Sequence, residues 1–303
     1  MDDNVAGSVS LSEFAATWGP ESENPFLDRY AGLDLAQWEE KSVAAIKAPV
    51  QDGIRFPALP PDDLQLQMHG QAGEPALREV FHFHRVVAAY CRRMQLGIGR
   101  DTTVLEFGTG WGRGLRPLMA KVSLRNLYGY ETTPTFCRVA RMLNPYVTIV
   151  NGRSVPPTPF AAGCFDLVFS LSTFAHMPRH NALAWLQEFA RILRPGALLF
   201  ITFWGERFIA ALKEAERAGR SGGAVHWFHE QVLREAGEIE ALEQRCKGGE
   251  VVFIPSGQYP DWGNTFVSPQ AAQNLQVDGM TLVGYDASLL PQDLVVFRRA
   301  SDT

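Results

Sequence analysis

Short apolar runs alternate with helical patterns through the middle of the chain. Runs with the length of buried strands occupy residues 104–105, 127–130, 147–150, 167–171 and 197–203. Between them, apolar residues spaced three and four apart predict helices over residues 115–120, 135–143 and 183–193. An alternation of strand and helix is typical of a parallel sheet whose two faces are covered by helices.

The residues before this core have a different pattern. Residues 1–61 carry scattered aromatic side chains and one helical pattern over 34–47, and they end in a proline cluster typical of an extended boundary. Apolar spacing over 75–96 predicts an amphipathic helix that leads into the core. We therefore expect an N-terminal helical or extended arm over residues 1–61 and one domain over residues 62–303.

The alternation lapses after Gly205. A helix with a charged face is predicted over residues 207–216, and a solvated helix over residues 231–244. We expect these helices to form a cap inserted into the domain over residues 206–262. The domain then closes with a predicted pair of strands over residues 280–285 and 293–298.

The composition is that of a globular protein. The 303 residues, 46% of them hydrophobic, suffice for one large core or two modest ones. A net charge of −5 with thinly spread Lys and Arg disfavours a nucleic-acid partner. The sequence has no apolar run of the roughly 18 residues that a membrane helix needs. It starts with acidic residues where a secretory signal would be basic, so we expect a cytoplasmic protein without a membrane partner.

Metal and disulfide chemistry have little support in the sequence. The four cysteines are scattered and form no cluster with histidines, so neither a disulfide framework nor a zinc site is predicted. Asp261 and Asp293 stand alone, which disfavours a magnesium-dependent mechanism. We therefore expect no metal site.

A glycine-rich turn follows the first predicted strand. Gly108, Gly110 and Gly112 form a Gly-x-Gly-x-Gly pattern, and Glu106 stands two residues before it. Glycines allow a tight turn and the close approach of a ligand to the main chain. A dinucleotide fingerprint would require a glycine where Arg113 stands. The spacing therefore favours the methionine portion of S-adenosylmethionine, whose ammonium group Glu106 would attract directly or through water.

Glu131 ends the second strand, nineteen residues after Gly112. A carboxylate in this place can accept hydrogen bonds from both ribose hydroxyls of a nucleoside. The alternative is a helix-capping role, although Thr132 and Thr133 before Pro134 already form a capping pattern. The distance from the glycine turn favours the ribose role.

Two further motifs carry a family resemblance. Residues 165–177 read Phe-Asp-Leu-Val-Phe-Ser-Leu-Ser-Thr-Phe-Ala-His-Met, and residues 185–196 end in Leu-Arg-Pro-Gly before the next strand. With the glycine turn, they resemble the class I S-adenosylmethionine-dependent methyltransferases, in particular the small-molecule group, over residues 64–205. The resemblance implies an α/β, Rossmann-like, doubly wound sheet of seven strands. That sheet is mostly parallel, with an antiparallel last strand and helices on both faces.

The resemblance also implies roles for single residues. Residues 108–110 would line the methionine half of the cofactor, and Ser170 and Leu171 would lie beside the sulfonium. Where the family often has Gly-Asp for the adenine amino group, this chain has Gly152-Arg153, so Ser154 or the main chain would hold the adenine. The full set of expected cofactor contacts is Glu106, Phe107, Gly108, Thr109, Gly110, Gly112, Glu131, Thr132, Arg153, Ser154, Ser170 and Leu171.

The chemistry expected is methyl transfer to an oxygen or nitrogen of a small molecule, such as a sugar or natural product. A hydroxyl nucleophile benefits from a base, and His176 after the fourth strand is the candidate. Its alternative role is structural, at the turn before the helix at Asn181. The aromatic residues 226–229 are interpreted either as pocket lining or as packing. Trp111 and Arg113 would touch the substrate or cover the cofactor.

Two rival functions are weighed against this one. A nicotinamide-dependent oxidoreductase is disfavoured by Arg113 at the required glycine position. A non-catalytic partner or regulator that keeps the fold is disfavoured by the intact glycine turn.

Overall fold

The computed structural model describes residues 24–289 and 291–301. The chain divides into two compact units: Met1–Phe169 with Ile192–Leu198, and Ser170–Arg191 with Leu199–Thr303. Among the described residues, none of the helices has the length and apolar character needed to cross a bilayer.

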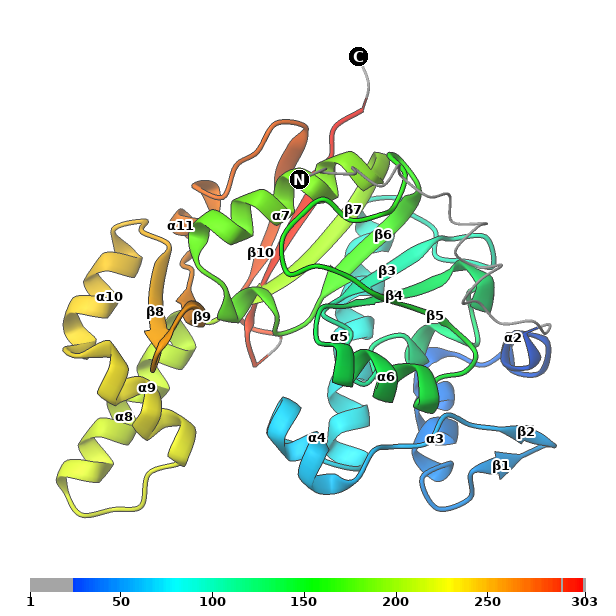
Figure 1. Ribbon diagram of the computed structural model, residues 1–303, viewed down its shortest axis with the longest axis horizontal. Coiled ribbons are helices and arrows are strands. Elements are labelled where there is room, and N and C mark those ends of the chain that lie inside the picture. The colour runs from blue at the N-terminus through cyan, green and yellow to red at the C-terminus, as the bar shows by residue number, and fades with distance from the viewer. Residues whose placement is uncertain (1–23, 290, 302–303) are drawn as a thin grey trace, which may run out of the picture. The chain divides into compact units, whose positions relative to one another are not determined.

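The sheet has seven strands in the order β10-β11-β7-β6-β3-β4-β5 (Figure 1). β3 pairs in parallel with β4 and β6, β4 pairs in parallel with β5, and β10 and β11 are antiparallel. The predicted fold class, a doubly wound and mostly parallel sheet with an antiparallel end, is confirmed. The strand bounds are β3 Val104–Phe107, β4 Leu127–Glu131, β5 Thr148–Asn151, β6 Phe165–Ser170, β7 Leu193–Phe203, β10 Met280–Asp286 and β11 Asp293–Arg299.

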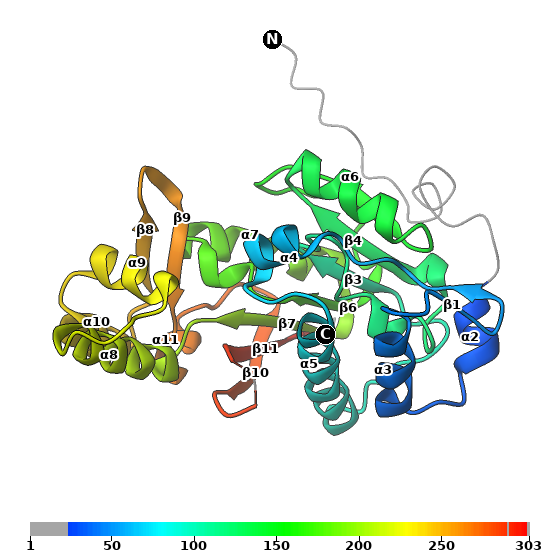
Figure 2. The ribbon, with the colours of Figure 1, turned by 90° about the horizontal axis from the view of Figure 1, so that it is seen from below.

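The helices of the first unit follow from apolar spacing and helix-start residues. α5 (Glu74–Arg93) buries one apolar face and lies beside α3 (Leu35–Ala44), whose start is stabilised by a capping box at Asp34 (Figure 2). α6 (Pro134–Leu143) begins with proline, which suits the first helical position. The remaining elements are α2 (Pro25–Tyr30), α4 (Asp62–His69), the short strands β1 (Val50–Gln51) and β2 (Ile54–Arg55), and the 3₁₀ turn η2 (Leu124–Asn126).

The helix predicted over residues 115–120 is wrong. The segment contains only a 3₁₀ turn, η1 (Arg116–Leu118). Leu115, Leu118 and Met119 are all buried. Apolar spacing there reflects a turn enclosed on all sides, and the sequence pattern cannot distinguish this from one buried helical face.

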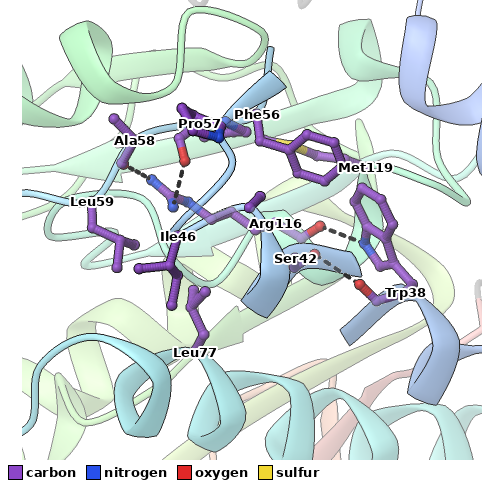
Figure 3. Close-up of a pocket in the computed structure, with 12 residues that line it drawn as sticks. Trp38, Ser42, Ile46, Phe56, Pro57, Ala58, Leu59, Leu77, Arg116 and Met119 are labelled. Atoms are coloured by element: carbon purple, nitrogen blue, oxygen red, sulfur yellow. Dashed lines mark hydrogen bonds between the residues drawn. The ribbon is translucent and has the colours of Figure 1, made fainter. Parts of the chain in front are cut away.

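The described part of the predicted arm packs into the first unit. The indole N–H of Trp38 donates to the carbonyl oxygen of Arg116 at 3.0 Å. The Arg116 guanidinium in turn donates to the carbonyl oxygens of Pro57 and Ala58 at 3.1 and 2.6 Å (Figure 3). These residues line a cavity of about 290 Å³ together with Ser42 and other mostly apolar side chains. The boundary at residue 61 stays a prediction, and residues 1–23 of the arm lie outside the described residues.

The second unit contains α7 (Arg179–Ile192), which ends where β7 begins. Its described residues also form the helices α8 (Glu206–Arg220), α9 (Trp227–Ala236), α10 (Ile239–Lys247) and α11 (Pro269–Gln273), and a hairpin of β8 (Val252–Ser256) and β9 (Tyr259–Phe266) (Figure 1). Side chains from α8, α9, α10 and the hairpin form one apolar cluster around Leu212, Val232 and Phe266. The cap over residues 206–262 stays a prediction.

The single helix predicted over residues 231–244 is wrong. Two helices, α9 and α10, occupy this stretch and are separated at Gly237, where φ is 70°. A left-handed residue cannot continue an α-helix. Because residues 231–244 are rich in polar side chains, their sequence pattern did not indicate the break at Gly237.

Candidate functional site

The loop after β3 turns at three glycines in the left-handed conformation. The angle φ is 73° at Gly108, 56° at Gly110 and 84° at Gly112, values that side chains with a Cβ atom rarely adopt. The N–H groups of Gly108 and Thr109 donate to the carbonyl oxygen of Tyr130 at 2.9 and 3.1 Å. The loop is thereby tied to the end of β4.

Glu131, the last residue of β4, fastens the same loop through its side chain. Its Oε2 accepts the N–H of Gly110 at 2.9 Å, and its Oε1 accepts the N–H of Thr133 at 2.8 Å. Thr133 is the N-cap residue of α6. Glu131 therefore supports the start of the helix and also lies against the glycine loop. Burial raises the pKa of its carboxyl group.

Glu106 lies beneath the loop with almost no exposure to solvent. Its Oε2 accepts the hydroxyl of Thr109 at 2.6 Å. A Cβ atom on Gly114 would lie 1.9 Å from its Oε1, so glycine at position 114 leaves room for this carboxyl group. Burial raises the pKa of Glu106 to about 8, although the Thr109 hydroxyl and the charge of Arg113 oppose that rise. A positive charge beside this buried carboxyl group would stabilise its ionised form.

The outer half of the loop is held by Asn144. A Cβ atom on Gly112 would lie 2.5 Å from the Asn144 Nδ2 atom, which donates to the carbonyl oxygen of Trp111 at 2.7 Å. The Trp111 ring is fully buried and packs against Leu77 and Leu143. The glycine at 112 is therefore required by a close approach as well as by its φ angle. Asn144 was missed by sequence reasoning, because only the fold brings this residue to the loop.

Sequence comparison with known proteins identifies the core. Residues 105–201 match the methyltransferase domain family. The chain is 30% identical to a demethylmenaquinone methyltransferase of Chlorobaculum tepidum over 123 residues, 40% of this chain and 48% of the relative. It is 27% identical to a 2-methyl-6-phytyl-1,4-hydroquinone methyltransferase of Synechocystis over 143 residues, 46% of this chain and 44% of the relative. The core of the chain, residues 105–201, is therefore a methyltransferase domain of the kind found in the class I S-adenosylmethionine-dependent methyltransferases.

The predicted family is thereby confirmed for this core, and S-adenosylmethionine is the cofactor that such a domain implies. The matches span about half the length of each curated relative. Among solved structures, a magnesium protoporphyrin IX methyltransferase of Synechocystis is similar with a TM-score of 0.46 and 14% identity, over 78% of this chain and 93% of that chain.

The other predicted cofactor contacts in the first unit differ in exposure. Phe107 is buried and its ring stacks on Tyr130 at 5.6 Å, so its side chain belongs to the core. Thr132 is half-buried, whereas Arg153 and Ser154 are exposed after β5. The carbonyl oxygen of Arg153 accepts the hydroxyl of Tyr130 at 2.9 Å.

Arg113 and Trp111 serve the interior of this unit. The Arg113 guanidinium donates to the carbonyl oxygen of Ala76 at 3.0 Å and forms an ion pair of 2.5 Å with Glu79. Since the Trp111 ring is fully buried, both side chains anchor the loop to α5 and its neighbours. The structure gives neither of them a place facing solvent.

Ser170, Leu171 and His176 belong to the second unit. Ser170 ends β6 and is buried, and His176 ends the 3₁₀ turn η3 (Phe174–His176). The His176 Nδ1 atom is 2.9 Å from the carbonyl oxygen of Gly263. Its ring stacks on Trp262 with centroids 4.8 Å apart. Burial lowers the pKa of His176 below its usual value.

A polar network in the second unit was missed by sequence reasoning. The N–H of Ser172 donates to the Thr202 hydroxyl oxygen at 2.7 Å, and that hydroxyl donates to Gln292 Oε1 at 2.6 Å. The Gln292 amide returns to the Ser172 hydroxyl at 2.9 Å. Ser172 has a φ of 67°, which is unusual outside glycine. Since such backbone strain clusters at functional sites, the network is a further candidate region.

The aromatic segment 226–229 serves packing and capping in large part. His226 is the N-cap of α9, and its Nδ1 accepts the N–H of Phe228 at 3.3 Å. Phe228 packs against Trp204 and Phe208 in the apolar cluster of the second unit. Trp227 is 63% exposed. Within residues 24–289 and 291–301, no group of three His, Cys, Asp or Glu side chains is arranged to hold a metal ion.

Proposed function

We propose that this methyltransferase transfers the methyl group of S-adenosylmethionine to an oxygen or nitrogen atom of a small-molecule acceptor. The observation that carries this proposal is the hydrogen bond between the Gly110 N–H and the Glu131 carboxylate. It brings the acid at the end of β4 directly against the glycine loop after β3, as a nucleoside-binding site at the edge of a parallel sheet requires.

The residues of the loop fit this cofactor. Glycines with positive φ let the chain turn tightly at the end of β3, so the loop lies at the edge of the parallel sheet where nucleoside ligands bind. Glu106 suits the cofactor's ammonium group, and Glu131 suits its ribose, because a carboxylate oxygen can accept more than one hydrogen bond. When bound, S-adenosylmethionine supplies an activated methyl group, so the protein's own task is to position the acceptor and exclude water.

The remaining contacts are assigned by family resemblance. Thr132, Arg153 and Ser154 follow the ends of β4 and β5, where the adenosine half of the cofactor would bind. The exposed Ser154 hydroxyl or the main chain would hold the adenine, and Arg153 supplies no carboxylate for its amino group. Ser170 and Leu171 are assigned to the sulfonium end.

His176 is proposed as the base that takes the proton of an acceptor hydroxyl. Its Nδ1 faces the carbonyl oxygen of Gly263, so Nδ1 carries the hydrogen and Nε2 keeps a lone pair. A lowered pKa keeps the ring neutral near pH 7, which is the form that can accept a proton. The alternative is a purely structural role, in which the bond to Gly263 holds η3 against β9.

Two observations favour an aromatic acceptor: the names of two similar proteins and the exposed ring of Trp262. The similar protein from Chlorobaculum tepidum is named a demethylmenaquinone methyltransferase, and the one from Synechocystis is named a hydroquinone methyltransferase. In this chain, Trp262 stacks on His176 and is still 51% exposed, so it offers a surface on which an aromatic acceptor can stack. Phenolic and hydroquinone compounds therefore come first among the acceptors to be tested, followed by sugars and glycosylated natural products.

The first experiment measures binding and turnover separately. Calorimetric titration with S-adenosylhomocysteine should give a single binding site, and mass spectrometry should detect methylated product from at least one acceptor class. Absence of S-adenosylhomocysteine binding would contradict the proposal. Binding without turnover on any acceptor class favours a non-catalytic partner or regulator, and binding of NADH in place of S-adenosylhomocysteine favours an oxidoreductase.

A further inference from the structure

The end of helix α4 lies against the glycine loop in the first unit. A Cβ atom built on Gly110 would lie 3.1 Å from Met68 Cε, 3.6 Å from His69 Cε1 and 3.8 Å from His69 Nε2. Gly110 is the residue whose N–H is bound by Glu131. The His69 imidazole therefore borders the part of the loop at which the cofactor would bind.

The position of α4 is fixed by a buried glutamine. Gln65 Nε2 donates to the carbonyl oxygen of Pro60 at 2.7 Å, and Gln65 Oε1 accepts the N–H of Gly73 at 3.0 Å. The helix ends at Gly70, which has a φ of 70°. These contacts hold the chain on both sides of α4, so His69 is presented to the loop by a braced element.

The His69 Nε2 atom is shut off from solvent and has no hydrogen-bond partner among the described residues. The ring contacts the edge of Trp111, with centroids 6.0 Å apart. Burial, helped by the charge of Arg113, lowers the pKa of His69 well below its usual value, so the ring is neutral. An unpaired polar atom in such a place is unfavourable and calls for a partner that is not part of the protein.

The main-chain donors at the three glycines of the loop are already in use, whereas the Trp111 indole N–H is, like His69 Nε2, buried without a partner among the described residues. The N–H groups of Gly108 and Thr109 donate to the carbonyl oxygen of Tyr130, and the N–H of Gly112 donates to the carbonyl oxygen of Thr109. The N–H of Gly110 is also in use. The two acids of the loop region, which would serve the cofactor's ammonium and ribose, are acceptors.

The Arg113 guanidinium is already paired within the protein and does not supply a donor for the cofactor. It donates to the carbonyl oxygen of Ala76 and pairs with Glu79. The amino-acid end of the cofactor, however, carries a carboxylate as well as an ammonium group, and the carboxylate needs a donor.

We propose that His69 Nε2–H donates a hydrogen bond to the carboxylate of the bound cofactor. This inference rests on the proposed function, because it assumes S-adenosylmethionine at the loop. It assigns a role to a residue that precedes the matched domain, residues 105–201, and explains why a histidine nitrogen is buried without a partner. Met68 beside it would cover the same ligand.

The test compares two ligands that differ only in the carboxylate. S-adenosylhomocysteine and its decarboxylated analogue are titrated into the wild-type protein, His69→Phe and His69→Gln by calorimetry. Phenylalanine keeps a ring against Trp111 but has no donor, whereas glutamine keeps an N–H group. We expect His69→Phe to bind S-adenosylhomocysteine about 10- to 100-fold more weakly, as for a hydrogen bond to a charged group. Its affinity for the decarboxylated analogue should stay within about twofold, and His69→Gln should recover part of the loss.

A second readout is independent of any variant. The ¹⁵N resonance of His69 Nε2 should shift when S-adenosylhomocysteine is added to the wild-type protein and much less with the decarboxylated analogue. If His69→Phe loses affinity for both ligands equally, or the resonance responds to both alike, the proposal is wrong and His69 only packs over the loop. If the wild-type protein binds neither ligand, the proposed function itself fails, which is a different result.

Discussion

Glu131 and Gly110 are joined by a hydrogen bond of 2.9 Å between a buried carboxylate oxygen and a main-chain N–H. Gly110 lies in the loop after β3 and Glu131 ends the neighbouring strand β4, so the bond helps to shape the loop. It therefore links the stability of the loop to the capacity to bind the cofactor's ribose.

Replacement of Glu131 by glutamine should weaken both properties. An amide keeps the size of the side chain, but one of its two ends would present N–H groups to the N–H of Gly110 or Thr133. We expect the affinity for S-adenosylhomocysteine to fall about 10- to 100-fold, since hydrogen bonds to a charged group contribute about 1.5–3 kcal/mol. Calorimetric titration measures this, with the exposed Glu240→Gln as the matched control. Equal affinities for the two variants would show that Glu131 has no part in binding.

Gly112→Ala should destabilise the first unit by about 1–3 kcal/mol, the usual range for strain combined with overpacking. The alanine would have to adopt a φ of 84° and its Cβ would meet the Asn144 amide at 2.5 Å. Gly53→Ala is the control, because Gly53 has a φ of 79° but no atom within 4 Å of a Cβ. Urea denaturation of both variants separates the two effects. A loss no larger than that of the control would mean that Asn144 simply moves aside.

The sequence predicted the sheet well because its strands are buried on both faces. Runs such as residues 127–130 and 167–169 contain no charged residue and are mostly apolar or aromatic, which is characteristic of central parallel strands. The glycine turn was also readable, since its spacing reflects φ angles that only glycine adopts easily. These features depend on residues close together in the chain.

The site residues that sequence reasoning missed depend on contacts between residues far apart in the chain, whereas two helix predictions failed within short segments. Asn144 and His69 reach the loop only through the fold, so no local pattern marks either one. The helix predicted over 115–120 is a turn because it is buried on several sides at once. The helix predicted over residues 231–244 is two helices, α9 and α10, because the chain breaks at Gly237.

The buried carboxyl group of Glu106 predicts a pH dependence of stability. Its pKa rises from 4.5 to about 8 on folding. The folded protein therefore holds an extra proton between these values, and its free energy of unfolding should fall as the pH rises from about 4.5 through about 8. Glu106→Gln, which cannot titrate, should show a smaller fall. Urea denaturation from pH 5 to 9 tests this, and parallel curves for the two proteins would contradict the prediction.

The same group predicts proton release on cofactor binding. If the ammonium of the cofactor lies near Glu106, its positive charge lowers the pKa of that carboxyl group. S-adenosylhomocysteine should then bind more tightly as the pH rises from 6 to 8, and the protein should release a proton when it binds. Calorimetry in buffers of different ionisation enthalpy measures that proton. Zero release in the wild-type protein, matching Glu106→Gln, would place the ammonium elsewhere.

The two possible roles of His176 depend on different ring nitrogens: a base needs Nε2, whereas a structural histidine needs only Nδ1. Nδ1 faces the carbonyl oxygen of Gly263 at 2.9 Å, so only Nε2 is left to accept a proton. His176→Asn keeps an N–H group near the Nδ1 position and removes the base, whereas His176→Ala removes both. If Nε2 is the base, both variants should lose about 10²- to 10⁴-fold in turnover on a hydroxyl acceptor, while their affinity for S-adenosylhomocysteine stays nearly unchanged.

The pH profile supplies the second half of this test. Burial lowers the pKa of His176, so wild-type turnover should hold down to a pH below 6.5 and then fall as the imidazole takes up a proton. Neither variant should show that fall, because neither can titrate there. If His176→Asn turns over like the wild-type protein and only His176→Ala is impaired, the bond to Gly263 is what matters. His176 would then be a residue that holds the turn η3 against β9.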